Sequence, residues 1–363
     1  MKKKLFYLIP IIALCIIGLS AFEMVHAHSD DRNLMKEAYI SNKFMINTPC
    51  KIIVYDKDKE TVVKNAWKYG QSLADKVDTY DKNNHSQIQE INDNAGVKPV
   101  VVDEDVYDVM KKGMTLSKLP VGGYDQSVGT ITDLWGIGTD HQKVPTQTEI
   151  TNALKYVNWQ KIQMNDANHS VYLEEKGMKL DLGGTSEGWI GGKIAEYLKE
   201  HGVTSGIVNM GGSIYVIGHS NQGKDTPWTV GIQDPTGARE TIIGSVPGVD
   251  EAFTTAGIYE RNITVGDTVY SHIMDPKTGW PYQNSLAGVS IIGKDEAMTD
   301  ALDDWVFSLG LKHGYEEIAK MKDVNAVFVT KDNKVYVTPG IANDFRLAAN
   351  SGFVLGDIGD VKE

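Results

Sequence analysis

The chain has 363 residues, enough for one large domain or two intimate ones, and 41% of them are hydrophobic, as in a folded globular protein. Its 48 acidic residues outnumber its 36 lysines and arginines, which gives a formal net charge of -12. This acidic balance argues against nucleic acid as a partner and, beyond the N-terminus, against an anionic membrane surface.

Residues 1–27 are predicted to be a targeting segment outside the fold. Lys2, Lys3 and Lys4 precede an apolar run over 5–22. The segment ends in the small-x-small pattern after which signal peptidase cuts. Cleavage of a signal peptide after Ala27 is therefore the first interpretation.

Two alternatives remain for this segment. The apolar run is at the lower edge of the length that spans a bilayer, so an uncleaved N-terminal anchor is the second interpretation. Lipidation at Cys15 is the third, because Leu14 stands where a small residue is expected. In each case the working domain is expected to be exported and to lie outside the cytoplasmic membrane, at the cell surface or associated with the membrane.

The remaining chain is predicted to be a polar tether over 28–40 and one domain over 41–363. Strand-like runs cluster in pairs between amphipathic helical patterns, which favours an α+β fold with antiparallel or mixed sheets. Strands are expected at 51–55, 99–102, 205–210, 213–218, 228–233, 289–293, 324–330 and 334–338. Helices are expected at 60–77, 103–119, 187–201, 295–309 and 314–321.

Two absences in the sequence argue against particular folds and against a disulfide. No strand followed by a GxGxxG or Walker loop occurs, so dinucleotide folds of the Rossmann type and P-loop folds are disfavoured. Cys50 is the only cysteine after the targeting segment, which excludes an internal disulfide. Its place in a strand-like run favours a packed core thiol over a nucleophile.

Four glycine-containing loops mark places where a ligand can approach the backbone: 122–127, 181–188, 210–213 and 270–279. The loop at 181–188 links a strand-like run over 178–182 to a helix expected to begin near Glu187. Backbone N–H groups at such a helix start bind anions, although a tight turn explains the same pattern. The Gly-Gly pair after Asn209 is likewise typical of a hairpin turn.

Three aspartates, Asp300, Asp303 and Asp304, lie on one face of the helix expected at 295–309. Carboxylates this close repel one another unless a cation lies between them, and Mg2+ is often held by one or two carboxylates together with substrate phosphates. The alternative is a solvated acidic face, or carboxylates that favour the positive end of the helix dipole. With the four loops, the aspartates indicate one cleft that binds phosphate and metal.

Six motifs occur in an order that resembles the ApbE family, the FAD:protein FMN transferases, over about residues 44–340. They are Phe44-Met-Ile-Asn-Thr48, Gly123-Tyr-Asp125, Asp181-Leu-Gly-Gly184 with Glu187-Gly188, Asn209-Met-Gly-Gly212, Ser271-His-Ile-Met-Asp-Pro276 with Thr278-Gly279, and Asp300-Ala-Leu-Asp-Asp304. The resemblance implies an α+β fold. It also implies an enzyme that uses Mg2+ to cleave FAD, attaches FMN through a phosphoester to a threonine of a partner protein, and releases AMP.

The resemblance also assigns roles to particular residues. It implies that Asp300, Asp303 and Asp304 bind the metal together with the backbone carbonyl of Gly184. It places His272 in the chemistry, either in proton transfer or in holding the diphosphate. The positions that match the family's FAD site are Met45, Tyr80, Gly123, Tyr124, Asp125, Asp181, Glu187 and Ile273.

The chain departs from the family pattern at three places. Ile46-Asn47-Thr48 stands where the family commonly has Met-Gly-Thr, which leaves open whether Met45 or Ile46 takes the methionine's place. Asp304 stands where many members have threonine, and Glu187 replaces a common lysine. These changes bear on metal identity and FAD affinity, whereas phosphoryl transfer itself relies mostly on positioning and charge neutralisation.

The sequence therefore predicts an exported, Mg2+-dependent flavin transferase. Its acceptor is expected outside the membrane too, as a flavin-carrying electron-transfer protein or lipoprotein. Two other functions remain open at this point: a metal-dependent FAD diphosphatase, in which water replaces the threonine, and a flavin-binding protein.

Overall fold

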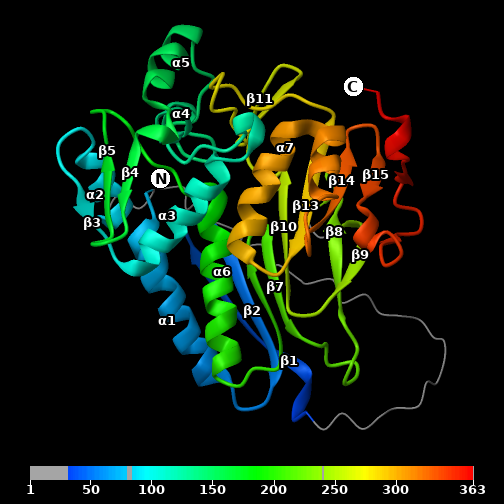
Figure 1. Cartoon of the computed structure of the whole chain (residues 1–363). Coiled ribbons are helices and arrows are strands. Elements are labelled where there is room, and N and C mark those ends of the chain that lie inside the picture. Colours follow the sequence, from blue (N-terminus) through cyan, green and yellow to red (C-terminus); the bar gives the residue numbers. More distant parts are fainter. Residues whose placement is uncertain (1–31, 80–83, 239–240, 363) are drawn as a thin grey trace, which may run out of the picture.

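A long mixed sheet forms the middle of the protein (Figure 1). The computed structural model describes residues 32–79, 84–238 and 241–362. Within these residues the sheet has nine strands in the order β1-β2-β6-β7-β10-β13-β14-β15-β17. Neighbours are antiparallel except for the parallel pair β15 and β17. The strands are β1 (Leu34–Met45), β2 (Thr48–Asp56), β6 (Ser205–Met210), β7 (Ser213–Gly218), β10 (Glu251–Gly257), β13 (Leu286–Gly293), β14 (Asn325–Thr330), β15 (Lys334–Val337) and β17 (Val354–Leu355).

Helices cover one face of this sheet. They are α1 (Glu60–Val77), α3 (Glu104–Ser117), α6 (Gly183–Glu200) and α7 (Glu296–Ile318). In α1 the buried residues Val63, Ala66, Trp67 and Leu73 recur at helical spacing, so a single apolar stripe packs on the sheet. In α7 the carboxylate of Asp295 accepts a hydrogen bond from the N–H of Met298 and caps the helix start.

A smaller sheet covers the opposite face. It contains β8 (Trp228–Gln233), β9 (Ile242–Gly248) and β16 (Arg346–Leu347). Apolar residues of both sheets, such as Val216, Ile243 and Val327, form a second core between them. The central strand β13 is buried along its whole length because it has a core on each side. The fold is thus α+β with mixed sheets, as predicted.

The remaining elements lie around the upper edge of the main sheet in Figure 1. The short helices α4 (Gly129–Trp135) and α5 (Gln147–Ala153) and a hairpin extend there, and a three-stranded sheet with the short helix α2 (Gln87–Asp93) stands beside α3. The hairpin is β11 (Asn262–Val265) with β12 (Thr268–Ser271), and the three-stranded sheet is β3 (Val100–Val101), β5 (Ser170–Leu173) and β4 (Ile162–Asn165).

Three local expectations need correction. The strand β1 begins at Leu34, so most of the expected tether belongs to the sheet. The segment 178–182 makes only an isolated bridge through Lys179, and α6 begins at Gly183 rather than near Glu187. The two helices expected at 295–309 and 314–321 are the two parts of α7, which meet at Gly310 with φ 73°.

Within the described residues, no helix has the length and apolar character needed to cross a membrane. The predicted targeting segment 1–27 lies outside those residues, so cleavage, anchoring and lipidation all stay predictions.

Candidate functional site

An open cavity of about 1190 Å³ gathers almost all the residues predicted for the site. Its walls come from the β1–β2 turn, the start of α6, the β6–β7 turn, the residues that flank the β11–β12 hairpin, and the first half of α7. Tyr80 lies outside the described residues, and its role in the FAD site stays a prediction. The predicted residues that line the cavity are Met45, Gly123, Tyr124, Asp125, Asp181, Gly184, Glu187, His272, Ile273, Asp300, Asp303 and Asp304.

Glycines in the first half of α6 bring this helix against the acidic part of α7. A Cβ atom on Gly188 would lie 2.5 Å from the carbonyl oxygen of Glu296 and 2.6 Å from Cβ of Asp300. A Cβ on Gly184 would lie 2.6 Å from Oδ2 of Asp304. Only residues without a side chain permit this approach, so the glycines position the backbone of α6 beside the aspartates.

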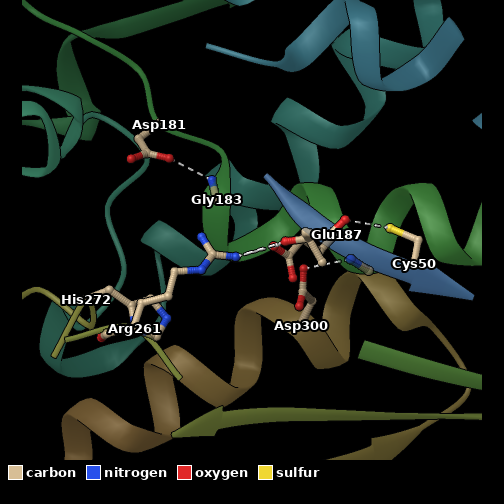
Figure 2. A network of polar contacts seen from close by, with 9 residues as sticks. Cys50, Asp181, Gly183, Glu187, Arg261, His272 and Asp300 are labelled. Atoms are coloured by element: carbon tan, nitrogen blue, oxygen red, sulfur yellow. Dashed lines mark hydrogen bonds and ion pairs between the residues drawn. The ribbon is translucent and has the colours of Figure 1, made fainter. Parts of the chain in front are cut away.

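The close approach creates a hydrogen bond between the two helices. The N–H of Gly188 donates to Oδ2 of Asp300 at 2.8 Å (Figure 2). In a regular α-helix this N–H donates to the carbonyl of Gly184. Asp300 therefore competes with the carbonyl of Gly184 for the N–H of Gly188. This competition leaves the Gly184 carbonyl oxygen more able to bind a ligand such as a cation.

Burial and mutual repulsion dominate the electrostatics of the acidic cluster formed by Asp300, Asp303 and Asp304. Burial raises the pKa of Asp300 and of Asp303 well above the usual range, and neighbouring carboxylates raise both further. Burial, followed by repulsion from Asp181 and Glu187, raises the pKa of Asp304 to about 7. A cation among these carboxylates would reverse these shifts because it favours the ionised form.

The donor set of this cluster fits a hard divalent cation, since it consists of carboxylate and carbonyl oxygens. Within the described residues, no three His, Cys, Asp or Glu side chains form a metal site by themselves. An ion at this position would therefore also need oxygens from the backbone, as at Gly184, or from a bound phosphate.

A polar network crosses the cavity beside the cluster, as Figure 2 shows for Glu187 and Arg261. Nη2 of Arg261 donates to Oε1 of Glu187 at 2.6 Å and to Oγ1 of Thr48 at 3.1 Å. The hydroxyl of Thr48 donates to the same glutamate oxygen at 2.7 Å. Sequence reasoning missed Arg261, because its contact with Glu187 joins residues 74 positions apart and no motif marks it.

His272 is held through its own backbone and ring to one carbonyl oxygen. Its N–H and its Nδ1 both contact the carbonyl of Arg261, at 3.0 and 3.2 Å. A carbonyl only accepts hydrogen bonds, so Nδ1 carries the proton and Nε2 keeps its lone pair. Burial, followed by the positive charge of Arg261, lowers the pKa of His272 to about 4. The ring is therefore neutral near pH 7 and can accept a proton.

Asp125 and Asp181 stabilise the loops that shape the cavity. Asp125 accepts hydrogen bonds from the N–H and hydroxyl of Ser127, at 2.8 and 2.7 Å, and from the N–H of Trp159 at 3.1 Å. Asp181 accepts from the N–H of Gly183 at 2.7 Å, at the start of α6. Both carboxylates thus fix backbone in addition to lining the cavity.

The predicted positions on the apolar side of the cavity belong to the cores behind it. Tyr124 and Ile273 are buried in the core that packs on α7, and Met45 is buried in the core under α1 and α6. A Cβ on Gly123 would lie 1.7 Å from Oγ of Ser308, so glycine is required for this loop to lie against α7.

The turn between β1 and β2 projects two residues into the cavity. Ile46 and Asn47 have φ values of 43° and 57° and connect the paired residues Met45 and Thr48. Two positive φ values at the centre of a two-residue hairpin define a type I′ turn. Asparagine tolerates this conformation, whereas a β-branched isoleucine is strained in it. Met45 is buried and Ile46 half-buried at the cavity wall, and both line it.

The comparisons with known proteins agree on one family. The model of the ApbE family matches residues 46–328. A FAD:protein FMN transferase of Treponema pallidum is 30% identical over 332 residues, which cover 87% of this chain and 91% of the relative. One from Klebsiella pneumoniae is 29% identical over 253 residues, which cover 70% and 78%.

Solved structures give the same result for the fold. The crystal structure of the ApbE protein of Thermotoga maritima superposes with a TM-score of 0.77 at 26% identity, covering 84% of this chain and 98% of that one. The flavin transferase ApbE of Vibrio cholerae has a TM-score of 0.72 at 23% identity and covers 83% and 98%.

Proposed function

Because the chain belongs to the ApbE family of flavin transferases, we propose that it transfers FMN from FAD to a threonine of an acceptor protein and releases AMP. The observation that carries this proposal is the single cavity in which the acidic cluster, the start of α6 and a neutral His272 meet. In the reaction, the bond between the FMN phosphorus and the AMP oxygen breaks as a bond from the threonine oxygen to that phosphorus forms.

His272 is the group best suited to take the threonine proton. Its Nε2 has a free lone pair because Nδ1 is held to the carbonyl of Arg261. Its lowered pKa keeps the ring unprotonated at neutral pH, so that Nε2 is open to a proton from the threonine. The same ring nitrogen could instead orient the diphosphate, in which case the rate would depend on it without a proton moving.

A Mg2+ ion would be held by Asp300, Asp304 and the carbonyl of Gly184, with Asp303 next to them. When bound, the ion supplies positive charge that neutralises the diphosphate. The support is the oxygen-only donor set, the raised pKa values of the aspartates, and the second acceptor that Asp300 offers to the N–H of Gly188. The contact between Arg261 and Glu187 orients a positive charge toward the same space.

The acceptor and the enzyme are both proposed to act outside the cytoplasmic membrane. The support is the sequence of residues 1–27, which combines lysines, an apolar run and a small-x-small end. The acceptor is accordingly proposed to be an exported flavin-carrying electron-transfer protein or lipoprotein.

Incubation of the protein with FAD, Mg2+ and an exported acceptor tests the proposed function. The acceptor should gain the mass of FMN less water, AMP should appear in equal amount, and an acceptor with its threonine replaced by alanine should gain nothing. AMP and FMN without an acceptor would indicate a diphosphatase, and intact FAD would indicate a flavin-binding protein. Equal labelling by FMN in place of FAD would contradict the mechanism, because no phosphoanhydride would be cleaved.

A further inference from the structure

A second groove of about 550 Å³ opens between β1 and α1 and adjoins the main cavity. Met45 and Gln71 line both spaces, so the two adjoin at these residues. The strand contributes Tyr39, Ser41 and Lys43 on the groove side, which alternate as strand geometry requires.

The floor of the groove is fixed by a contact between the helix and the strand. Trp67 of α1 is buried, and its Nε1–H donates to Oγ of Ser41 at 2.9 Å. This bond ties α1 to the second half of β1. The groove therefore has a defined floor at the point where it approaches Met45 and the main cavity.

Three exposed lysines line this groove in a protein with a net charge of -12. Lys43 comes from β1, and Lys64 and Lys68 stand one turn apart on α1. In the part of the chain that the structure describes, none of the three forms an ion pair, whereas lysines elsewhere on the surface do, among them Lys76, Lys111, Lys112, Lys143 and Lys179. Glu60 is the single acidic residue among those that line the groove.

The strand beside the groove also has an outer edge with which no other described strand pairs. Among the described strands, β1 is the last of the nine-stranded sheet on its side, and it runs from Leu34 to Met45 at the cavity. The outward N–H and C=O groups of such a strand bind extended peptides by adding a strand to the sheet.

We propose that an extended, acidic segment of the acceptor protein binds in this groove. Its carboxylates contact Lys43, Lys64 and Lys68, its backbone lies along the outer edge of β1, and its hydroxyl residue reaches the main cavity beside Met45. This proposal rests on the proposed function, since it names the kind of partner that the transferase modifies.

Peptide binding to a charge-reversed variant tests this proposal. The variant carries Lys64→Glu and Lys68→Glu, and the matched control carries Lys98→Glu and Lys224→Glu, two exposed lysines that line neither space. The probe is a fluorescein-labelled peptide of Asp, Ser and Gly residues around one threonine. Its counterpart has Asn in place of every Asp. Binding is measured by fluorescence anisotropy, and FAD affinity by flavin fluorescence.

The acidic peptide should bind the wild type and the control alike, and at least about tenfold more weakly to the groove variant. The Asn peptide should bind the wild type more weakly than the Asp peptide. Equal affinity of the groove variant and the control for the acidic peptide, or no binding to the wild type, would overturn the proposal. So would a loss of FAD affinity confined to the groove variant, which would assign the lysines to FAD.

Two further readouts separate the remaining possibilities. Vesicles of phosphatidylglycerol are tested with the same three proteins, and a loss of vesicle binding without a loss of peptide binding would make the groove a membrane-binding surface. FMN transfer to the peptide is measured by mass. Peptide binding that depends on the lysines without any FMN transfer would support the groove and contradict the proposed function instead.

Discussion

At the scale of the residue, His272 combines a fixed ring with low basicity. The carbonyl of Arg261 holds Nδ1–H, and burial, followed by the positive charge of Arg261, disfavours a second proton. If the ring takes the threonine proton, His272→Ala should lower kcat by about 100-fold or more while the melting temperature barely changes. Steady-state kinetics and thermal unfolding measure the two effects. Loss of activity in proportion to lost stability would indicate a structural role.

The same histidine should make stability depend on pH in a defined window. Its pKa is about 4 in the folded protein against 6.5 ordinarily, so between these values the unfolded chain binds a proton that the folded chain does not. The contribution is fully present above pH 6.5 and is lost as the pH falls toward about 4. His272→Gln removes it, so urea unfolding of this variant should lose less stability over that range than the wild type. Parallel pH profiles would contradict the neutral buried ring.

Substitution of Asp300 should lower activity without lowering stability. Because the carboxylate is buried among other carboxylates, Asp300→Asn removes repulsion and keeps an oxygen for the N–H of Gly188. Transfer should fall about 100-fold or more, since the metal is proposed to supply several kcal/mol to the transition state. In EDTA, the Asp300→Asn variant should unfold at a urea concentration at least as high as that needed to unfold the wild type. EDTA should reproduce the loss in the wild type, and full activity in excess EDTA would contradict the metal proposal.

At the scale of the element, the contact between α6 and α7 determines the shape of the site. Gly188→Ala would place a methyl group 2.5 Å from the carbonyl oxygen of Glu296, so the helices must separate. We expect a loss of about 1–3 kcal/mol in the free energy of unfolding, together with a loss of transfer activity.

Gly192→Ala on the same helix is the matched control. Its added Cβ would meet only the side chain of Glu296, at 3.4 Å, which is an ordinary contact. Alanine favours helix over glycine, so this variant should be unchanged or more stable by about 0.5–1 kcal/mol. Urea unfolding and transfer assays of both variants check the pair. Equal effects of the two substitutions would show that the close approach at Gly188 is unimportant.

Elements with a strong local pattern were predictable from the sequence. The expected helix at 60–77 and the strands at 205–210, 213–218 and 228–233 have the bounds that the structure shows. The start of α6 was not predictable from the sequence. Gly183, Gly184 and Gly188 have low helix propensity, and only packing on α7 makes that segment helical.

The strand β10 was also missed, for a related reason. Its residues 251–257 are mostly small or polar, so its local strand signal is weak. It is a strand because β7 and β13 pair with its two edges. Within the site, the acidic face of α7 was predictable because it depends only on the spacing of aspartates along one helix. The contact of Arg261 with Glu187 was not predictable, because it depends on tertiary structure.

At the scale of the whole molecule, a cation in the cavity should stabilise the entire fold. An ion that binds only the folded state raises stability with its concentration. Mg2+, alone and with FAD, should therefore raise the melting temperature of the wild type, and the rise should disappear in Asp300→Asn. Differential scanning fluorimetry with Mg2+ and, as the control, an equal ionic strength of Na+ distinguishes binding from screening. An equal rise with both salts would contradict a specific site.

The arrangement of the walls also governs when the site can first exist. The cavity joins Met45, near the beginning of the described chain, to Asp304 on α7, and β2 finds its second neighbour only in β6, where Cys50 pairs with Met210. Closing such long loops is slow relative to forming local helices and hairpins. A chain that emerges from its N-terminus therefore has no complete cavity until α7 has appeared and docked, so the proposed transfer can begin only after synthesis of the domain is nearly complete.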